Sequence, residues 1–192
     1  MPSLNTISNW FKYSQIEYFT PFMKLWLAFN SWYKQFLPNL HTDREAINSI
    51  KLSGSIKDSF EYIIETTSDQ GRELKEAISI LVKELRIHKL FDGSSNSIGF
   101  DQSDIEPNFR NLSTQSKNKK LRSGNFIKLD EETVVTSDKS ILFQETLEVI
   151  YQTRCCLIHG DFDVDNQRAH RLIKNSFIIL NKIFGPIVLN TQ

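Results

Sequence analysis

The chain has 192 residues, of which 40% are apolar, 24% are charged and 11% are aromatic. This composition is typical of a single globular domain with a sizeable buried core, and it excludes a wholly disordered or fibrous chain. The 23 Lys and Arg residues balance the 23 Asp and Glu residues, which excludes a protein that coats nucleic acid through its overall charge.

The first predicted element is an apolar helix over residues 22–37, bracketed by Pro21 and Pro38. Proline is tolerated in a first helical turn and discourages helix continuation at the far end. Apolar side chains cover more than one stripe of this helix, so we expect it to lie centrally or to be shared with a partner chain. Asn30, alone in this apolar setting, is expected to make a polar contact across a dimer or to cap a backbone group.

Helical periodicity predicts five further segments, at residues 43–52, 55–66, 72–90, 139–158 and 165–184. Gly160 is expected to close the fourth of these helices as a left-handed C-cap. An Asp N-cap is expected at the start of the last helix, and Gly185-Pro186 is expected to stop it. The fold class is therefore all-α, an up-down helical bundle in a single domain over residues 1–192.

Between residues 92 and 137 the helical pattern is replaced by stretches rich in Ser, Asn and Lys, which are typical of loops. Within this segment, FIKL and TVV flank DEE and predict a short hairpin. We expect residues 92–137 to form a peripheral insertion, because they lack enough apolar residues for a core of their own. A basic cluster in this segment is expected either to contact RNA phosphates or to be merely solvated, namely Lys117, Lys119, Lys120 and Arg122.

The location of the protein is predicted from its cysteines and its apolar segments. Cys155 and Cys156 are adjacent, so they cannot cross-link distant parts of the fold, and a reducing compartment is the simplest interpretation. No basic region followed by an apolar stretch opens the chain, and the apolar segment 22–37 is too short and too polar to span a bilayer. A soluble cytoplasmic protein without a membrane segment is expected.

The segment YQTRCCLIHGD, at residues 151–161, holds the candidate catalytic residues. Arg154 and His159 lie five positions apart near the C-terminal end of a predicted helix, and Asp161 follows closely. Five positions at about 100° each leave the two side chains about 140° apart on a regular helix. They can converge only if the helix loosens at its end, or if two copies of it face each other across a dimer axis.

The string Tyr151-x-x-Arg154-x-x-Leu157-Ile158-His159-Gly160 resembles the signature of the HEPN superfamily, as found in stand-alone bacterial HEPN proteins. The upstream string Leu25-Trp26-x-x-Phe29-Asn30-x-x-Tyr33 resembles the first core helix of those proteins. The resemblance implies a HEPN-like helical bundle that forms a homodimer and pairs its motif helices around one cleft. It also implies a toxin or defence effector, with an antitoxin or a nucleotidyltransferase-like protein as a further partner.

The chemistry that the resemblance implies is metal-independent cleavage of RNA, without a cofactor. Neutral His159 would take the proton of a 2′-hydroxyl, and Arg154 would stabilise the charged phosphorane through forked hydrogen bonds. Asp161 is expected to orient the imidazole. Cys155 departs from the family pattern, because active members usually carry a polar residue, often Asn, directly after the arginine.

Several alternatives stay open from the sequence. One alternative is that Arg154 and His159 are structural, with the arginine in a salt bridge and the histidine capping the last carbonyls of the helix. A silent HEPN module that binds RNA or a nucleotide, and a purely structural dimeric helical protein, are the other readings of the whole chain. A thiol–imidazole dyad of Cys155 and His159 and a zinc site that adds Cys156 are weaker, and the DFDVDN run fails the pattern of a calcium loop.

Overall fold

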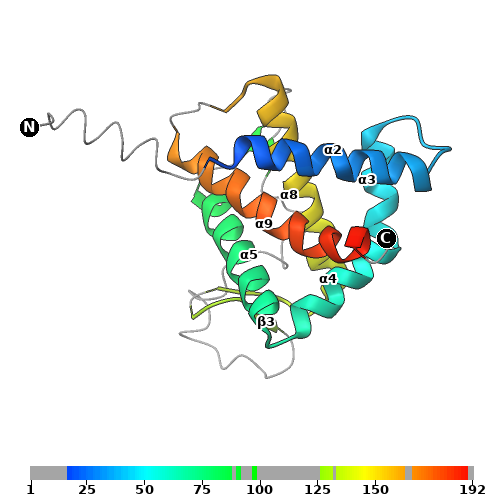
Figure 1. Ribbon diagram of the computed structural model, residues 1–192. Coiled ribbons are helices and arrows are strands. Elements are labelled where there is room, and N and C mark those ends of the chain that lie inside the picture. Colours follow the sequence, from blue (N-terminus) through cyan, green and yellow to red (C-terminus); the bar gives the residue numbers. More distant parts are fainter. Residues whose placement is uncertain are drawn as a thin grey trace, which may run out of the picture.

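The computed structural model describes residues 17–87, 90–91, 97–98, 126–131, 133–162 and 166–189, and this part of the chain is mostly helical (Figure 1). The helices are α2 (Phe19–Phe36), α3 (Asp43–Leu52), α4 (Ser55–Glu65), α5 (Asp69–Ile87), α8 (Lys139–His159) and α9 (Gln167–Leu189). The strands are β1 (Leu90–Phe91), β2 (Ser97–Ile98), β3 (Phe126–Lys128) and β4 (Val134–Thr136), paired as two antiparallel hairpins, β1 with β2 and β3 with β4. The predicted all-α class is therefore confirmed.

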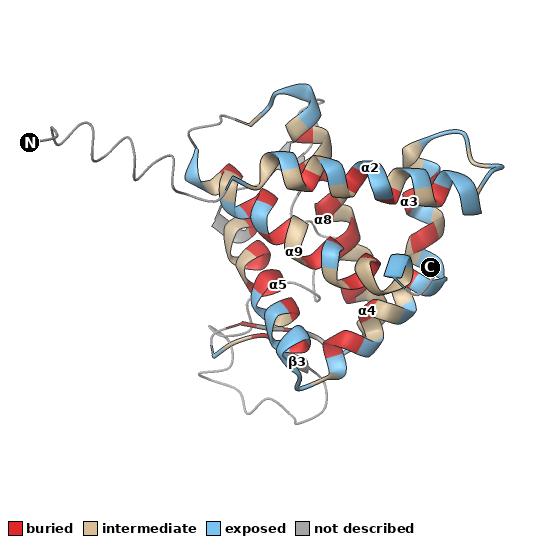
Figure 2. Ribbon diagram, in the orientation of Figure 1, coloured by how far each residue is buried: buried red, intermediate tan, exposed pale blue. Residues whose placement is uncertain are grey.

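Helices α8 and α9 form the centre of the described fold. Helix α9 packs against α5, α2, α4 and α8, and α8 packs in addition against α3, α4 and strand β4. Figure 2 shows the buried positions where the helices face one another and the exposed positions on their outer sides. Helix α8 is surrounded so completely that polar side chains are buried along it together with apolar ones, including Thr146, Gln152 and Thr153.

Helix α2 begins and ends close to the predicted bounds, but it buries only one face. Pro21 lies within its first turn, where no helical N–H is needed, and Pro38 follows its end. The buried side chains follow one another at intervals of three or four residues: Phe22, Trp26, Phe29 and Tyr33. On another side of the helix, Leu27 is 60% exposed. Helix α2 therefore covers the core, with Phe29 packed against the aromatic rings of α2 and against Phe184 of α9.

The helix ends show which local signals the sequence carries. Thr42 caps α3 in a capping box, in which its Oγ1 accepts from Glu45 N at 3.2 Å and Glu45 Oε2 accepts from Thr42 N at 3.1 Å. Gly160 ends α8 with a φ of 76°, as predicted, because this left-handed conformation strains a residue that has a Cβ. The cap of α9 is Asn166 rather than an aspartate, since Asn166 Oδ1 accepts from Arg168 N at 2.8 Å.

The predicted stop of the last helix at Gly185-Pro186 is wrong, because α9 continues to Leu189. Proline removes one backbone hydrogen bond, to the carbonyl four residues earlier, and leaves the remaining bonds of the turn in place. Ile183 and Phe184 are buried before the proline, and Ile187 packs against the same core after it. The apolar contacts on both sides of Pro186 hold the last turn helical.

The predicted hairpin is confirmed as β3 and β4, in which Ile127 pairs with Val135. It is not peripheral, because Val135 is fully buried in the core and Leu129 is nearly so. Asp130 in its turn accepts a hydrogen bond from Ser79 of α5 and one from Lys83 Nζ at 2.7 Å. The predicted insertion therefore joins the core at its C-terminal end, since apolar residues of the hairpin fill space beside α5 and α8.

Among the described residues, α9 is the one helix with the length and apolar composition of a membrane span. Those properties are shared by the core helices of globular proteins. In this structure α9 is packed against four other helices, which accounts for its apolar composition.

Candidate functional site

Helix α8 stays regular through the predicted catalytic motif and ends directly after His159. The N–H of Gly160 and that of Asp161 both donate to the carbonyl of Cys156, which closes the helix without loosening its last turn. The side chains of Arg154 and His159 therefore keep the separation of about 140° that a regular helix imposes. The two side chains therefore cannot converge through a loosened helix end. The remaining route is the pairing of two copies of α8 across a dimer axis.

Arg154 is held in one orientation by contacts with two other helices. Its Nη2 donates to Asp43 Oδ2 of α3 at 3.0 Å, and its guanidinium lies 5.6 Å from the ring centroid of Trp26 in α2. The side chain is 20% exposed, yet its Nε is buried and has no hydrogen-bond partner within the described part of the chain. The Nη1 atom lies 3.9 Å from the Cys155 sulfur, a weak acceptor. The arginine thus has a fixed ionic contact and retains donor capacity that no described residue uses.

Asp43 is the centre of a small polar cluster in which α2, α3 and α8 meet. Asn30 Nδ2 donates to Asp43 Oδ1 at 3.0 Å and also contacts the Tyr33 hydroxyl. Burial, followed by its hydrogen bond to the Asp43 carboxylate, raises the pKa of Tyr33 well above its usual value, so the phenol keeps its proton. The Asn30 amide therefore donates hydrogen bonds to side chains of its own chain, and the expectation that it caps a backbone group is wrong.

His159 and Asp161 are both exposed at the end of α8. Within the described part of the chain, neither side chain makes a hydrogen bond or an ion pair. Asp161 therefore does not orient the imidazole in this structure, contrary to the prediction, because the left-handed turn at Gly160 separates the two residues. His159 is left accessible to solvent.

The two cysteines differ in their surroundings. Burial, and secondarily the negative charge of Asp161, raises the pKa of the Cys156 thiol to about 11, so this thiol is protonated at neutral pH. A protonated thiol is neither a nucleophile nor a zinc ligand. Cys155 is partly exposed and contacts Arg154 and Tyr151 rather than His159. Within the described ranges, no three His, Cys, Asp or Glu side chains gather where they would hold a metal ion.

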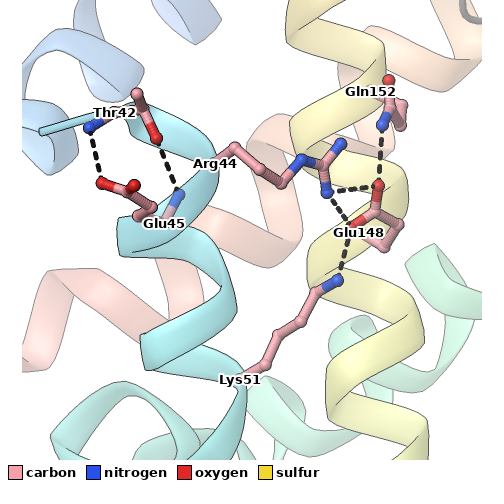
Figure 3. A network of polar contacts seen from close by, with 6 residues as sticks. All are labelled: Thr42, Arg44, Glu45, Lys51, Glu148 and Gln152. Atoms are coloured by element: carbon pink, nitrogen blue, oxygen red, sulfur yellow. Dashed lines mark hydrogen bonds and ion pairs between the residues drawn. The ribbon is translucent and has the colours of Figure 1, made fainter. Parts of the chain in front are cut away.

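A second polar network joins α3 to α8 one to two turns before Arg154 (Figure 3). Glu148 accepts hydrogen bonds from Arg44, Lys51 and Gln152, and Arg44 Nη1 lies 2.9 Å and 2.7 Å from its two oxygens. Burial alone would raise the pKa of Glu148, but these three donors together lower it. The guanidinium of Arg44 also lies 4.3 Å from the ring centroid of Tyr151. This network joins α3 to α8 through residues other than Asp43.

Sequence reasoning missed Asp43 as a member of the site. Its only local signal is an acidic residue in the first turn of a helix, which the helix dipole favours anyway. The predicted RNA-binding cluster, Lys117, Lys119, Lys120 and Arg122, lies outside the described residues. No family model, curated protein or solved structure matches the chain, so its HEPN resemblance stays a prediction from the two segments that carry it.

Proposed function

We propose that this protein is a metal-independent endoribonuclease of the HEPN type, with its active cleft formed where two copies of α8 meet. The observation that carries the proposal is the state of the two motif side chains. Arg154 is held in place by Asp43 and Trp26, and His159 is exposed at the end of the same helix, with no hydrogen bond to any residue that the structure describes. A positioned cation and a free imidazole are the two groups that cleavage by an internal 2′-hydroxyl requires.

In the proposed reaction, neutral His159 takes the proton of a ribose 2′-hydroxyl. The 2′-oxygen attacks the adjacent phosphorus, Arg154 donates hydrogen bonds to the charged phosphorane, and the bond to the 5′-oxygen breaks. The leaving 5′-oxygen takes a proton from solvent, and the products are a 2′,3′-cyclic phosphate and a 5′-hydroxyl. DNA is not cleaved, because it lacks the attacking hydroxyl.

The dimer is part of the proposal, because one chain holds its two motif side chains on different sides of a regular helix. Exposed apolar side chains on the two helices that carry the resemblance favour such an interface, namely Leu27 of α2 and Ile158 of α8. We expect sedimentation at micromolar concentration to give a dimer, and Ile158→Asp to shift it towards monomer with loss of cleavage. A wild-type monomer under these conditions contradicts the shared cleft.

A second candidate function is a silent HEPN module that binds RNA or a nucleotide. The observation that favours it is the engagement of Arg154: the Asp43 carboxylate already occupies one of its terminal nitrogens. Cys155 in place of the expected polar residue points the same way. The toxin or defence setting, and the antitoxin or nucleotidyltransferase-like partner, rest on the resemblance in both cases.

The test is cleavage of end-labelled RNA in the presence of EDTA, with analysis of the new ends. His159→Ala is expected to lower the cleavage rate by about 10²–10⁴-fold, because it removes the general base. Arg154→Lys keeps the charge but loses the planar fork, so it is expected to be impaired as well. His41→Ala, at an exposed histidine before α3, and Arg72→Lys, at an exposed arginine of α5, are the matched controls.

Each result of this test selects one function. Cleavage that leaves a 2′,3′-cyclic phosphate and depends on His159 supports the nuclease. Since His159 is exposed, its substitution is expected to leave the melting temperature within about 1 °C of wild type, which separates lost chemistry from lost folding. If the wild-type protein binds RNA but never cleaves it, the binding module replaces the nuclease.

A further inference from the structure

We infer that Asp43 is a positioning residue for Arg154, and that Asn30 in turn orients Asp43, so that the guanidinium meets a phosphate from one fixed direction. This inference rests on the proposed function and deepens it. The chain of contacts runs from Asn30 of α2 through Asp43 of α3 to Arg154 of α8, with each hydrogen bond at 3.0 Å.

The Asp43 carboxylate is held at both of its oxygens and at its backbone. One oxygen accepts from Asn30 and the other from Arg154, so the carboxylate cannot rotate without losing a hydrogen bond. The backbone is held by the capping box around it, because Thr42 and Glu45 bond to each other across the first turn of α3. A carboxylate fixed in this way holds the guanidinium that it binds in one orientation.

The guanidinium is constrained at every edge except one. Its Nη2 is occupied by Asp43, its Nε is buried, and the ring of Trp26 lies beside it. The donors that remain for a phosphate are on the terminal nitrogens, where Nη1 has, among the described residues, only the weak Cys155 sulfur within reach. The guanidinium of Arg154, with its five N–H donors, therefore offers hydrogen bonds to a phosphate at one edge only. Precise orientation of a reacting phosphate requires such a restriction.

The negative charge of Asp43 distinguishes a role in positioning Arg154 from a role in binding RNA. A carboxylate 3.0 Å from Arg154 lowers the net positive charge that a phosphate meets, so Asp43 opposes RNA affinity. Joining α3 to α8 does not depend on Asp43 either, because Arg44 and Lys51 already bind Glu148 across the same two helices (Figure 3). The role that we assign to this residue is the orientation of Arg154.

The first experiment compares full-length variants in single-turnover cleavage and in binding to a 2′-O-methyl RNA, which cannot be cleaved. Asp43→Asn is expected to lower the cleavage rate about 10–100-fold, the size of effect that a misplaced catalytic group produces. Its affinity for the 2′-O-methyl RNA is expected to stay within about twofold of wild type or to rise. Asn30→Ala is expected to change both quantities in the same directions but less. Lys51→Gln, which removes an ion pair between the same helices, is the control and is expected to leave both within about twofold.

The second experiment does not depend on cleavage. In protein labelled with ¹⁵N at arginine, the side chain of Arg154, assigned by its loss in Arg154→Lys, is expected to show slow rotation and separate Nη signals. Those signals are expected to merge in Asp43→Asn and in Asn30→Ala, and to persist in Lys51→Gln. The Asn30 variant keeps the test informative if Asp43→Asn does not fold.

The outcomes are distinct for the inference and for the proposed function. If the Arg154 signals are unchanged in both variants, or if Asp43→Asn cleaves RNA faster than wild type, the positioning role is overturned. A parallel loss of affinity and rate, with a matching loss of melting temperature, also overturns it in favour of a structural role. If wild type never cleaves RNA but the signals merge as expected, the nuclease proposal fails and the orientation of Arg154 by Asp43 stands.

Discussion

Two glutamates on successive turns of α8 are expected to respond in opposite ways to the same substitution. Glu148 accepts hydrogen bonds from Arg44, Lys51 and Gln152 (Figure 3), whereas Glu145 is half-buried near Lys51 and Glu148. Burial, opposed in part by Lys51, raises the pKa of Glu145, while the three donors lower the pKa of Glu148. We predict that Glu148→Gln destabilises the protein and that Glu145→Gln does not.

The magnitude follows from the contacts that each change removes. Arg44 is 40% exposed, so its pairing with Glu148 is screened and worth no more than about 1 kcal/mol. Lys51 is only 17% exposed, and loss of the Glu148 carboxylate from its ammonium costs about 1–2 kcal/mol, with Glu145 left as its nearby acidic residue. Glu148→Gln is therefore expected to lower the free energy of unfolding by about 1–3 kcal/mol, or roughly 2–12 °C in melting temperature for a chain of this size. Glu145→Gln is expected to be neutral or to add up to about 1 kcal/mol.

The direction of each pKa shift predicts how the stability change caused by each substitution depends on pH. A carboxylate with a lowered pKa contributes stability that is present above its unfolded value, near 4.5, and is lost as the pH falls through the folded value. The penalty of Glu148→Gln is therefore expected to shrink below about pH 4.5. Glu145 has a raised pKa, so the stability it contributes is present below about 4.5 and is lost as the pH rises through its folded value. Any gain from Glu145→Gln therefore belongs to neutral pH and disappears in acid.

The assay is urea unfolding followed by circular dichroism at 222 nm, for wild type and both variants, at several pH values from 4 to 8. The Lys51→Gln/Glu148→Gln double variant completes a cycle and isolates the pair, with an expected coupling of about 1 kcal/mol. Equal effects of the two glutamine substitutions, or a Glu148→Gln penalty that does not change with pH, would contradict the opposite contributions of Glu145 and Glu148 to stability.

The remaining predictions concern packing. Gly71→Ala is expected to destabilise the protein by more than about 2 kcal/mol, because an added Cβ would lie 2.4 Å from the Thr66 carbonyl oxygen. Gly185→Ala, whose added Cβ would meet nothing closer than 3.9 Å apart from its chain neighbours, is expected to cost far less, because its gain in helix propensity is offset by the crowding of a Cβ against Pro186; thermal melts that rank the pair the other way contradict the packing around α5 and α9. Val135→Ala is expected to cost about 2 kcal/mol, since this side chain is fully buried. Replacing residues 99–125 by a short Gly/Ser linker, which keeps β3 and β4, is expected to preserve cooperative unfolding, and a non-cooperative melt would place that segment in the core.

The helices and their ends were determined largely by local sequence. Residues three and four apart are neighbours on a helix, so their spacing marks a helix before any tertiary contact is known. The same holds for the Gly160 cap, since φ near 76° at a helix end depends on the residue itself. The β3–β4 hairpin was equally local, with a few residues joining two short β-prone runs. Prediction failed at Pro186, where core contacts on both sides outweighed a local stop signal.

The partners of those helices were decided only by the tertiary structure. Nothing in the local pattern shows that Asp43 meets Arg154, because 111 residues separate them and the contact depends on how α3 packs against α8. The apolar pattern of residues 22–37 predicted a central or shared helix, yet α2 buries one face while α8, with polar residues along it, is surrounded. Periodicity reports which residues are apolar, whereas burial depends on how many neighbours reach each face. That number is a property of the assembled bundle, and it is why the arginine of the motif could be read from the sequence and the carboxylate that holds it could not.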